Sequence, residues 1–282
     1  MKLIIHSDDY GMTNSINDAV IELCKAGVMS STSIMANMPY TADAVRLLGI
    51  PNTSLGVHAA FTQGKSIENP QNIPSLVDAD GNFYEYNTLV KRIKKGKVAS
   101  EDVYKELKAQ YKVIHDLIGD ELSFIDSHHG MHNKFRPFQD AFLRFGKETP
   151  GKAIRTKVLY YLVPGSGNKM QFKTAGLSPK KLLTHYYFLL VAKKFAKSYK
   201  VPDGMIVGKG NGIVEQLKKF HKIDWNGQKD KTLYIVSHPS KDLNELENTN
   251  LMQERVDEYN YLLSPEFREL AKTINFTNFA KL

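Results

Sequence analysis

Two adjacent carboxylates, Asp8 and Asp9, follow the apolar run that opens the chain, and Gly11 comes two residues later. The run at residues 2–7 is typical of a buried strand that delivers charged side chains to a loop. Buried carboxylates are costly unless they meet a cation, a proton or water. Because side chains alternate along a strand, we expect the two acids to point in different directions, so that one can bind a metal while the other handles a proton. The alternative is that one acid caps the following helix and the other is solvated.

Three histidines stand at comparable places, since His58, His128 and His238 each follow an apolar run. Neutral imidazole with a carboxylate nearby suits a first-row divalent ion. Three protein ligands with open positions for water are typical of a catalytic metal site, and Asp9, His58 and His128 would form such a set. His132 would share a face with His128 if a helical turn begins there. The histidines of residues 126–132 are also compatible with a hydrogen-bond network within a loop.

Elements that can position these residues alternate along the chain. Predicted strands cover residues 2–7, 28–35, 54–58, 122–125, 152–156, 205–207 and 233–237. One predicted helix begins after Thr13 or Ser15, and the others cover residues 41–48, 101–118, 137–145, 212–219 and 250–262. Residues 62–98 are predicted to form a long irregular loop, with a hairpin at Asp80-Gly81. This alternation predicts an α/β fold, a closed or partly closed barrel of about seven mainly parallel strands, similar to a TIM barrel. Chemistry is then expected at the carboxyl ends of the strands.

Length and composition bound the class of protein. The chain has 282 residues, of which 42% are hydrophobic and 24% charged, as expected for one folded domain over residues 1–282. The single cysteine, Cys24, excludes a disulfide within the chain. No secretion signal or apolar stretch of membrane-spanning length is recognised, so we expect a soluble cytoplasmic protein that does not bind membranes.

The formal charge of +8 raises the question of a nucleic-acid partner. Lysines gather at residues 91–97 and again at 180–200, within a segment at about 160–200 that we interpret as a lysine-rich helical insertion. No nucleic-acid motif accompanies them, so we expect no nucleic acid. A solvated face or a contact with an acidic partner or a second subunit, as in a homodimer, explains this density better.

Four motifs together resemble those of a known family. They are HSDDYG at residues 6–11, GVH at 56–58, DSHHGMH at 126–132 and SHP at 237–239. In this order they resemble the YdjC-type carbohydrate deacetylases, which include chitooligosaccharide (chitin disaccharide) deacetylases. The resemblance implies a distorted (β/α) barrel that removes an acetyl group from an N-acetylated sugar, such as diacetylchitobiose or its phosphate. It also implies a divalent metal ion on Asp9, His58 and His128, with Asp8 as the base and His238 as the acid.

Further positions are matched less closely. Arg155 stands where related deacetylases place an arginine beside the catalytic acid. The family often has Phe in place of Tyr10 and a third consecutive His in place of Gly130. These two differences leave the metal ligands intact, but they indicate that the substrate pocket differs from that of the family. His132, Arg155 and Tyr10 are therefore expected to contact the substrate or to support the metal ligands, and His132 is also a possible fourth ligand.

The residues leave several alternatives open. Mg²⁺ and Zn²⁺ are the expected ions, and Mn²⁺ or Co²⁺ would also suit two histidines and a carboxylate. A metal-dependent phosphoesterase or another amidohydrolase would use similar ligands. A sensor that binds sugar or metal without catalysis is a further alternative.

Overall fold

A single nine-stranded sheet organises the molecule. The computed structural model describes all residues except 175–178, 209–211, 224–230, 245 and 247–250. The strands are β1 (Lys2–Tyr10), β2 (Ser31–Ile34), β3 (Ser54–Ala59), β4 (Leu122–Ser127), β5 (Ala153–Ile154), β6 (Leu159–Pro164), β7 (Met170–Thr174), β8 (Gly204–Ile206) and β9 (Thr232–Ser237). Their order is β5-β4-β3-β2-β1-β9-β8-β6-β7, and every neighbouring pair is parallel except β6 with β7.

The sheet confirms the α/β class and the mainly parallel strands, with two differences. All seven predicted strands are present, and the antiparallel hairpin β6–β7 is additional. Among the described residues the sheet is open, with β5 and β7 as its edges, so it resembles a barrel that does not close. The segment at about 160–200 holds this hairpin as well as helix α6 (Pro179–Phe195).

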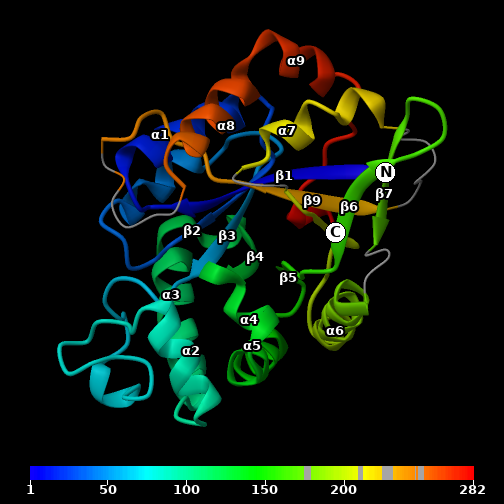
Figure 1. The fold of residues 1–282 in the computed structure, drawn as a ribbon. Coiled ribbons are helices and arrows are strands. Elements are labelled where there is room, and N and C mark those ends of the chain that lie inside the picture. Colours follow the sequence, from blue (N-terminus) through cyan, green and yellow to red (C-terminus); the bar gives the residue numbers. More distant parts are fainter. Residues whose placement is uncertain (175–178, 209–211, 224–230, 245, 247–250) are drawn as a thin grey trace.

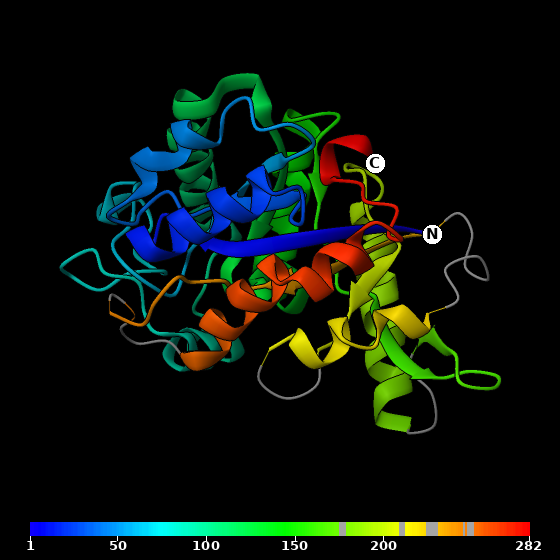
Figure 2. The same cartoon turned by 90° about the horizontal axis from the view of Figure 1, so that it is seen from above.

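Helices cover the strands as the alternation requires. The other α-helices are α1 (Asn14–Lys25), α2 (Tyr86–Lys94), α3 (Ser100–Ile118), α4 (Met131–Lys134), α5 (Arg136–Glu148), α7 (Val214–Leu217), α8 (Gln253–Leu263) and α9 (Pro265–Ala271). Short 3₁₀ turns are η1 (Thr41–Leu47), η2 (Pro70–Asn72), η3 (Gly119–Glu121), η4 (His128–Gly130), η5 (Phe220–Lys222) and η7 (Phe279–Lys281). α1 and α8 lie side by side next to β1, while α3 packs on β3, β4 and α5 (Figures 1 and 2).

The prediction that residues 62–98 form one irregular loop was wrong in part, because α2 lies within it. Leu89 is the only buried residue of α2, and three of its nine residues are lysine or arginine near its end. The helix was readable from the sequence, since Tyr86, Leu89, Val90 and Ile93 recur at the spacing of an amphipathic helix, and Tyr86 and Ile93 pack against the core.

One face of the sheet has its own small core, which we call the inner floor. Ile4, Phe124, Ala153 and Tyr234 form it together with Phe279 from the C-terminal segment. Alternating residues of a strand share a face, so the next inward residue after Ile4 is His6, and the next after Phe124 is Asp126. The strands therefore place polar side chains directly above an apolar floor.

Gly56 shows how closely β3 packs against this floor. A Cβ atom at residue 56 would lie only 2.4 Å from the Phe124 ring. Glycine is therefore required here for the ring to lie beside β3, and His58 follows two residues later on the same strand.

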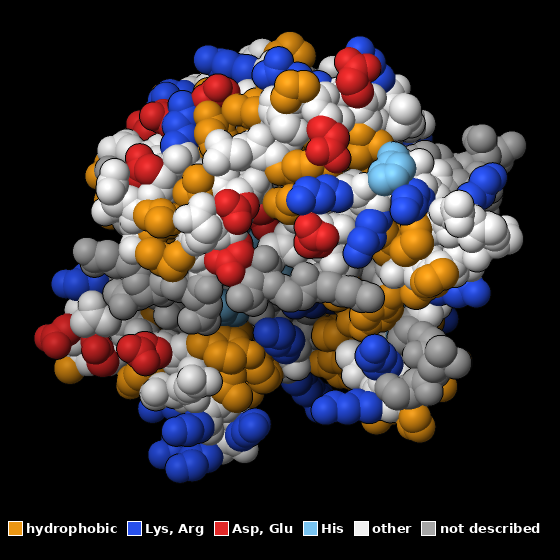
Figure 3. Space-filling view, turned by 45° about the horizontal axis from the view of Figure 1, so that its top comes forward, with side chains coloured by type: hydrophobic (Ala, Val, Ile, Leu, Met, Phe, Trp, Pro, Cys, Tyr) orange, Lys and Arg blue, Asp and Glu red, His pale blue; other side chains and the backbone are white. Residues whose placement is uncertain are grey.

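Charged side chains are mixed on the outer surface. Lysine and arginine alternate with acidic side chains on the face shown in Figure 3 and do not form one continuous patch there. Within the described residues, no helix combines the length and apolar character needed to cross a membrane.

Candidate metal centre and active site

Three ligand atoms converge at the ends of β1, β3 and β4. Asp9 Oδ1 lies 3.3 Å from His128 Nδ1 and 3.6 Å from His58 Nε2, and the two histidine nitrogens are 3.3 Å apart. A tetrahedral ion with bonds of about 2.0–2.1 Å keeps its ligand atoms about 3.3–3.4 Å apart. Asp9 Oδ1 is buried and has no hydrogen-bond partner among the described residues. The spacing of the triangle is therefore compatible with one divalent ion, and the three residues that the sequence analysis grouped lie together.

Asp9 reaches this triangle through an unusual backbone conformation. Its φ is 68°, and the pairing of β1 with β2 shifts register between Ser7 and Tyr10. The two acids approach different nitrogens of one imidazole, since Asp8 Oδ1 lies 3.9 Å from His58 Nδ1 and Asp9 Oδ1 lies 3.6 Å from His58 Nε2. A left-handed residue at position 9 interrupts the regular alternation of the strand.

Asp126 fixes the orientation of the His58 ring. Its Oδ1 atom lies 2.5 Å from His58 Nδ1, and both side chains are buried. When Nδ1–H donates to this carboxylate, the lone pair of Nε2 points to Asp9 and His128, as in many metal-binding histidines. Burial alone would lower the pKa of His58, but the carboxylates of Asp126 and Asp8 outweigh it and raise the pKa to about 9.

Asp8 is held by a cation and by a histidine. The Arg155 guanidinium contacts both carboxylate oxygens, at 2.5 and 3.0 Å, and His6 Nε2 lies 2.8 Å from Oδ1. Burial and the nearby Arg155 lower the pKa of His6, so the neutral ring can donate to Asp8. Burial alone would raise the pKa of Asp8, but Arg155 and His58 hold it well below its usual range. Asp8 therefore stays ionised.

The buried charges of this cluster do not balance. Asp8, Asp9 and Asp126 oppose the guanidiniums of Arg155 and Arg255, which pairs with Asp9 at 2.7 Å. With three carboxylates and two guanidiniums, the cluster has one uncompensated negative charge, which a proton on His58 or a metal ion can neutralise.

A second group of possible ligands, His6, Asp8 and Asp126, lies beside the first. Arg155 already forms ion pairs with both of these acids, at 2.5 and 2.9 Å. A divalent ion there would have to compete with a buried guanidinium for the same carboxylates. The triangle of Asp9, His58 and His128 is therefore the better candidate.

His238 lies on the open side of the site. Its Nε2 atom is 3.7 Å from Asp8 Oδ2, and its side chain is 27% exposed, compared with 1% for His58. His128 is 13% and Asp8 12% exposed. Among these five side chains, those of Asp8, His128 and His238 are therefore partly accessible to solvent, whereas those of Asp9 and His58 are covered.

The remaining predicted residues lie around the cluster. The ring nitrogens of His132 contact Ser127 Oγ at 2.6 Å and the Arg155 carbonyl oxygen at 2.8 Å. His129 has a φ of 57°, which breaks the helical turn expected to place His128 and His132 on one face. Tyr10 is buried, and its hydroxyl donates to the Asp43 carbonyl at 2.8 Å. These contacts support the surrounding backbone, and neither side chain joins the ligand triangle.

Four residues of the site were not assigned a role from the sequence: His6, Asp126, Arg255 and Glu258. Asp126 stands in a recognised motif, and His6 precedes Asp8 by two strand positions. Arg255 and Glu258 occupy buried positions of α8, where an amphipathic helix normally has apolar residues. Charged residues on the inward stripe of a predicted helix are the signal that could have identified the last two.

Comparison with protein families gives one match across almost the whole chain. A family model described as YdjC-like protein matches residues 2–273. Curated relatives match over shorter segments. A carbohydrate deacetylase of Vibrio vulnificus (strain CMCP6) is 36% identical over 140 residues, covering 49% of this chain and 53% of the relative. A carbohydrate deacetylase of Thermoanaerobacter pseudethanolicus is 39% identical over 82 residues, covering 29% of this chain and 33% of the relative. The chain thus matches about half the length of the Vibrio vulnificus relative and a third of the length of the Thermoanaerobacter pseudethanolicus relative.

A solved structure extends the likeness to the whole molecule. It is a protein from Enterococcus faecalis V583, named as a candidate cellobiose-phosphate cleavage protein. It superimposes with a TM-score of 0.75 at 25% sequence identity, and the match covers 99% of this chain and 98% of that chain. The overall fold is therefore shared with this protein along almost the whole of both chains.

Proposed function

The chain belongs to the YdjC-like protein family, and on that premise we propose that it is a metal-dependent hydrolase that removes the acetyl group from an N-acetylated sugar. The observation that carries the proposal is the unpartnered Asp9 Oδ1 atom beside His58 and His128, with Asp8 and His238 next to it. The names of the curated relatives support the reaction class.

Asp9, His58 and His128 would hold the ion, which would polarise the acetyl carbonyl and lower the pKa of a water molecule towards about 7. Two of the three donors are imidazole nitrogens, which favours zinc or another first-row ion over magnesium, whose preferred ligands are oxygens. This donor set leaves coordination positions open for water and substrate.

Asp8 and His238 would share the proton transfers. Asp8 remains ionised beside Arg155 and would accept a proton from the attacking water. His238 is more exposed and would donate a proton to the leaving amine, because an amide nitrogen does not depart as an anion. The distance of 3.7 Å between His238 Nε2 and Asp8 Oδ2 supports a joint role in one reaction.

The name of the Enterococcus faecalis protein suggests another reaction, the cleavage of cellobiose phosphate. Cleavage between the two sugars would be hydrolysis of a glycosidic bond, which usually needs one carboxylic acid that is protonated near neutral pH. Arg155 and His58 hold the pKa of Asp8 well below its usual range even though burial opposes them, and Arg255 and His128 do the same for Asp9. Neither acid is suited to that role, so amide hydrolysis agrees better with the charges of the site.

Acetate release tests the proposal. The wild-type protein with Zn²⁺, Mn²⁺, Co²⁺ or Mg²⁺ should release acetate from diacetylchitobiose or from its phosphate. Asp8→Asn and His238→Ala should each lower the rate about 10²–10⁴-fold. His221→Ala, an exposed histidine on η5, should have the wild-type rate. Release of reducing sugar or phosphate without acetate, or normal rates in both site variants, would refute the proposal.

A further inference from the structure

Helix α8 turns two charged side chains towards the site. Arg255 and Glu258 are three residues apart, so they lie on the same face, and they are 3% and 1% exposed. Burial of charged groups is costly unless each finds a partner. Both partners lie in or beside the ligand cluster, at the ends of β1 and β9.

Arg255 contacts one oxygen of the metal ligand Asp9. Its Nη2 atom lies 2.7 Å from Asp9 Oδ2, and both side chains are 3% exposed. The other oxygen, Oδ1, faces His58 and His128. The guanidinium thus holds one oxygen of the carboxylate and leaves the second for an ion. It also braces a residue in a left-handed backbone conformation, which residues other than glycine rarely adopt.

Glu258 holds the backbone next to His238. Its Oε2 atom accepts hydrogen bonds from the His238 N–H at 2.6 Å and from the Ser237 hydroxyl at 2.8 Å. Its Oε1 atom accepts from the Ile213 N–H at 3.1 Å, which ties the segment before α7 to the same carboxylate. The position of the His238 backbone is thus set by a residue twenty positions later in the chain.

We propose that Arg255 and Glu258 are positioning residues, through which α8 sets the orientation of the ligand Asp9 and the placement of the acid His238. The proposal rests on the proposed function for the role of His238, whereas the role of Arg255 concerns metal binding alone. Each residue acts through another side chain and is not expected to touch the substrate.

Removal of Arg255 should change the metal affinity in opposite directions, depending on whether its charge or its effect on the orientation of Asp9 dominates. A cation beside Asp9 repels a divalent ion, so its removal would strengthen metal binding if charge alone mattered. If Arg255 mainly orients Asp9, its removal should weaken binding, because partners that orient metal ligands typically contribute 10–100-fold in affinity. The positioning role therefore requires a higher Kd after substitution.

Calorimetric titration with Zn²⁺ decides between them and needs no substrate. Arg255→Met should raise the Zn²⁺ Kd about 10–100-fold. Arg255→Lys keeps the charge but loses the planar fork, so it should raise the Kd as well, and it serves as the test if the Met variant does not fold. Arg268→Met removes an exposed arginine of the adjacent α9 and should leave the Kd unchanged. An unchanged or lower Kd in a folded Arg255 variant would overturn this part of the proposal.

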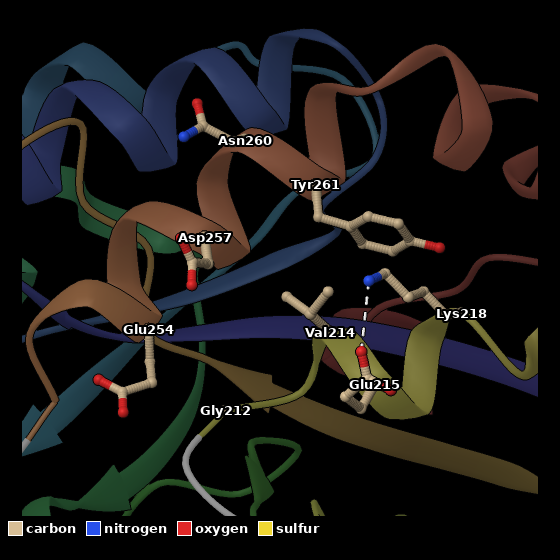
Figure 4. A pocket seen from close by; sticks show the side chains of 8 residues that line it. All are labelled: Gly212, Val214, Glu215, Lys218, Glu254, Asp257, Asn260 and Tyr261. Carbon is tan, nitrogen blue, oxygen red and sulfur yellow. Dashed lines mark hydrogen bonds and ion pairs between the residues drawn. The ribbon is translucent and has the colours of Figure 1, made fainter.

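Steady-state kinetics tests Glu258. Glu258→Gln replaces one accepting oxygen by an NH₂ group, which would face the N–H and O–H groups that Glu258 now binds. The backbone next to His238 should then shift, so we expect kcat to fall at least tenfold. KM and the Zn²⁺ Kd should remain near wild type. Asp257→Asn is the matched control, because Asp257 lies on the other face of α8 beside a surface pocket with Glu254 and Asn260 (Figure 4). A folded Glu258→Gln enzyme with normal kcat would contradict the role of Glu258.

The two measurements separate this inference from the proposed function. A wild-type protein that releases no acetate, with a raised Zn²⁺ Kd in Arg255→Met, would refute the deacetylase and leave the role of Arg255 intact. A wild-type protein that releases acetate, with an unchanged Kd in Arg255→Met, would refute the role of Arg255 alone.

Discussion

At the scale of single residues, the triangle proposed to bind the metal contacts a carboxylate that does not belong to it. Asp126 contacts His58 Nδ1 at 2.5 Å and pairs with Arg155 at 2.9 Å. It thus links His58, a proposed metal ligand, to the guanidinium that pairs with Asp8, the proposed base. A change at Asp126 should therefore affect metal binding as well as the proton-transfer residues.

Asp126→Asn should raise the Kd for Zn²⁺ about 10–100-fold. The amide has nearly the same shape, but it lacks the negative charge that favours Nδ1–H on His58 and that attracts the cation. Calorimetric titration measures the effect, and Asp120→Asn, an exposed acid on η3 before the same strand, is the control. Equal affinities for Asp126→Asn and the wild type would show that this carboxylate does not support the ligand.

At the scale of elements, α3 anchors the segment that follows β3. The Glu106 carboxylate accepts hydrogen bonds from the Ile67 and Glu68 N–H groups at 3.0 and 2.9 Å. The Gln110 side chain accepts a hydrogen bond from the Ala60 N–H and donates one to the Ala60 carbonyl oxygen. Burial raises the pKa of Glu106 to about 7, although these hydrogen bonds oppose the shift. The backbone at Ile67 and Glu68, in the segment after His58, is thus held by the titratable carboxyl group of Glu106.

This anchor predicts a pH dependence of stability. A carboxyl group with a raised pKa in the folded state stabilises the fold fully below its unfolded pKa of about 4.5, and this contribution is lost as the pH rises towards and beyond 7. The free energy of unfolding of the wild type relative to Glu106→Gln should therefore fall between pH 4.5 and 8. The shift from 4.5 to about 7 corresponds to a fall of about 3 kcal/mol.

Urea denaturation at several pH values measures this difference. Glu121→Gln, an exposed acid on η3, should show no such trend relative to the wild type. A constant difference between wild type and Glu106→Gln across the pH range would mean that Glu106 has an ordinary pKa.

Local patterns and spacing predicted the elements that bury much apolar surface. The apolar stripe of α1 and its cap Thr13 are readable from the sequence, and the structure has both. The carboxyl ends of parallel strands also predicted where Asp9, His58 and His128 meet. α2 and the hairpin β6–β7 were missed although both have a readable signal, because Tyr86, Leu89, Val90 and Ile93 recur at helical spacing and residues 159–163 form an apolar run rich in β-prone residues.

Long-range pairing of charges explains what else the sequence did not reveal. Arg255 lies 246 residues from Asp9, and no local pattern indicates which acid a buried arginine will meet. The left-handed conformation of Asp9 was also hidden, since it depends on a bulge between β1 and β2.

At the scale of the whole molecule, the C-terminal segment completes the inner floor below the site. The Phe279 ring lies 4.6 Å from that of Phe124, 5.8 Å from that of Tyr234 and 5.7 Å from that of His6, measured between ring centres. Residues from both ends of the chain and from its middle therefore meet beneath the ligand cluster.

Phe279→Ala should lower the free energy of unfolding by about 3–5 kcal/mol, because a fully buried aromatic ring leaves a cavity. Denaturant titration measures the loss. Tyr186→Ala, which removes an aromatic ring that is 55% exposed on α6, should change the stability by less than about 0.5 kcal/mol. Similar small losses in both variants would mean that the C-terminal segment does not support the fold.

The central claim is that strand ends far apart in the sequence bind one cation at Asp9, His58 and His128. Anomalous X-ray diffraction from crystals grown with Zn²⁺ or Mn²⁺ tests it most directly. We predict one strong anomalous peak within about 2.0–2.3 Å of Asp9 Oδ1, His58 Nε2 and His128 Nδ1. A peak on His6, Asp8 and Asp126 instead, or no peak at the strand ends at saturating metal, would contradict the account.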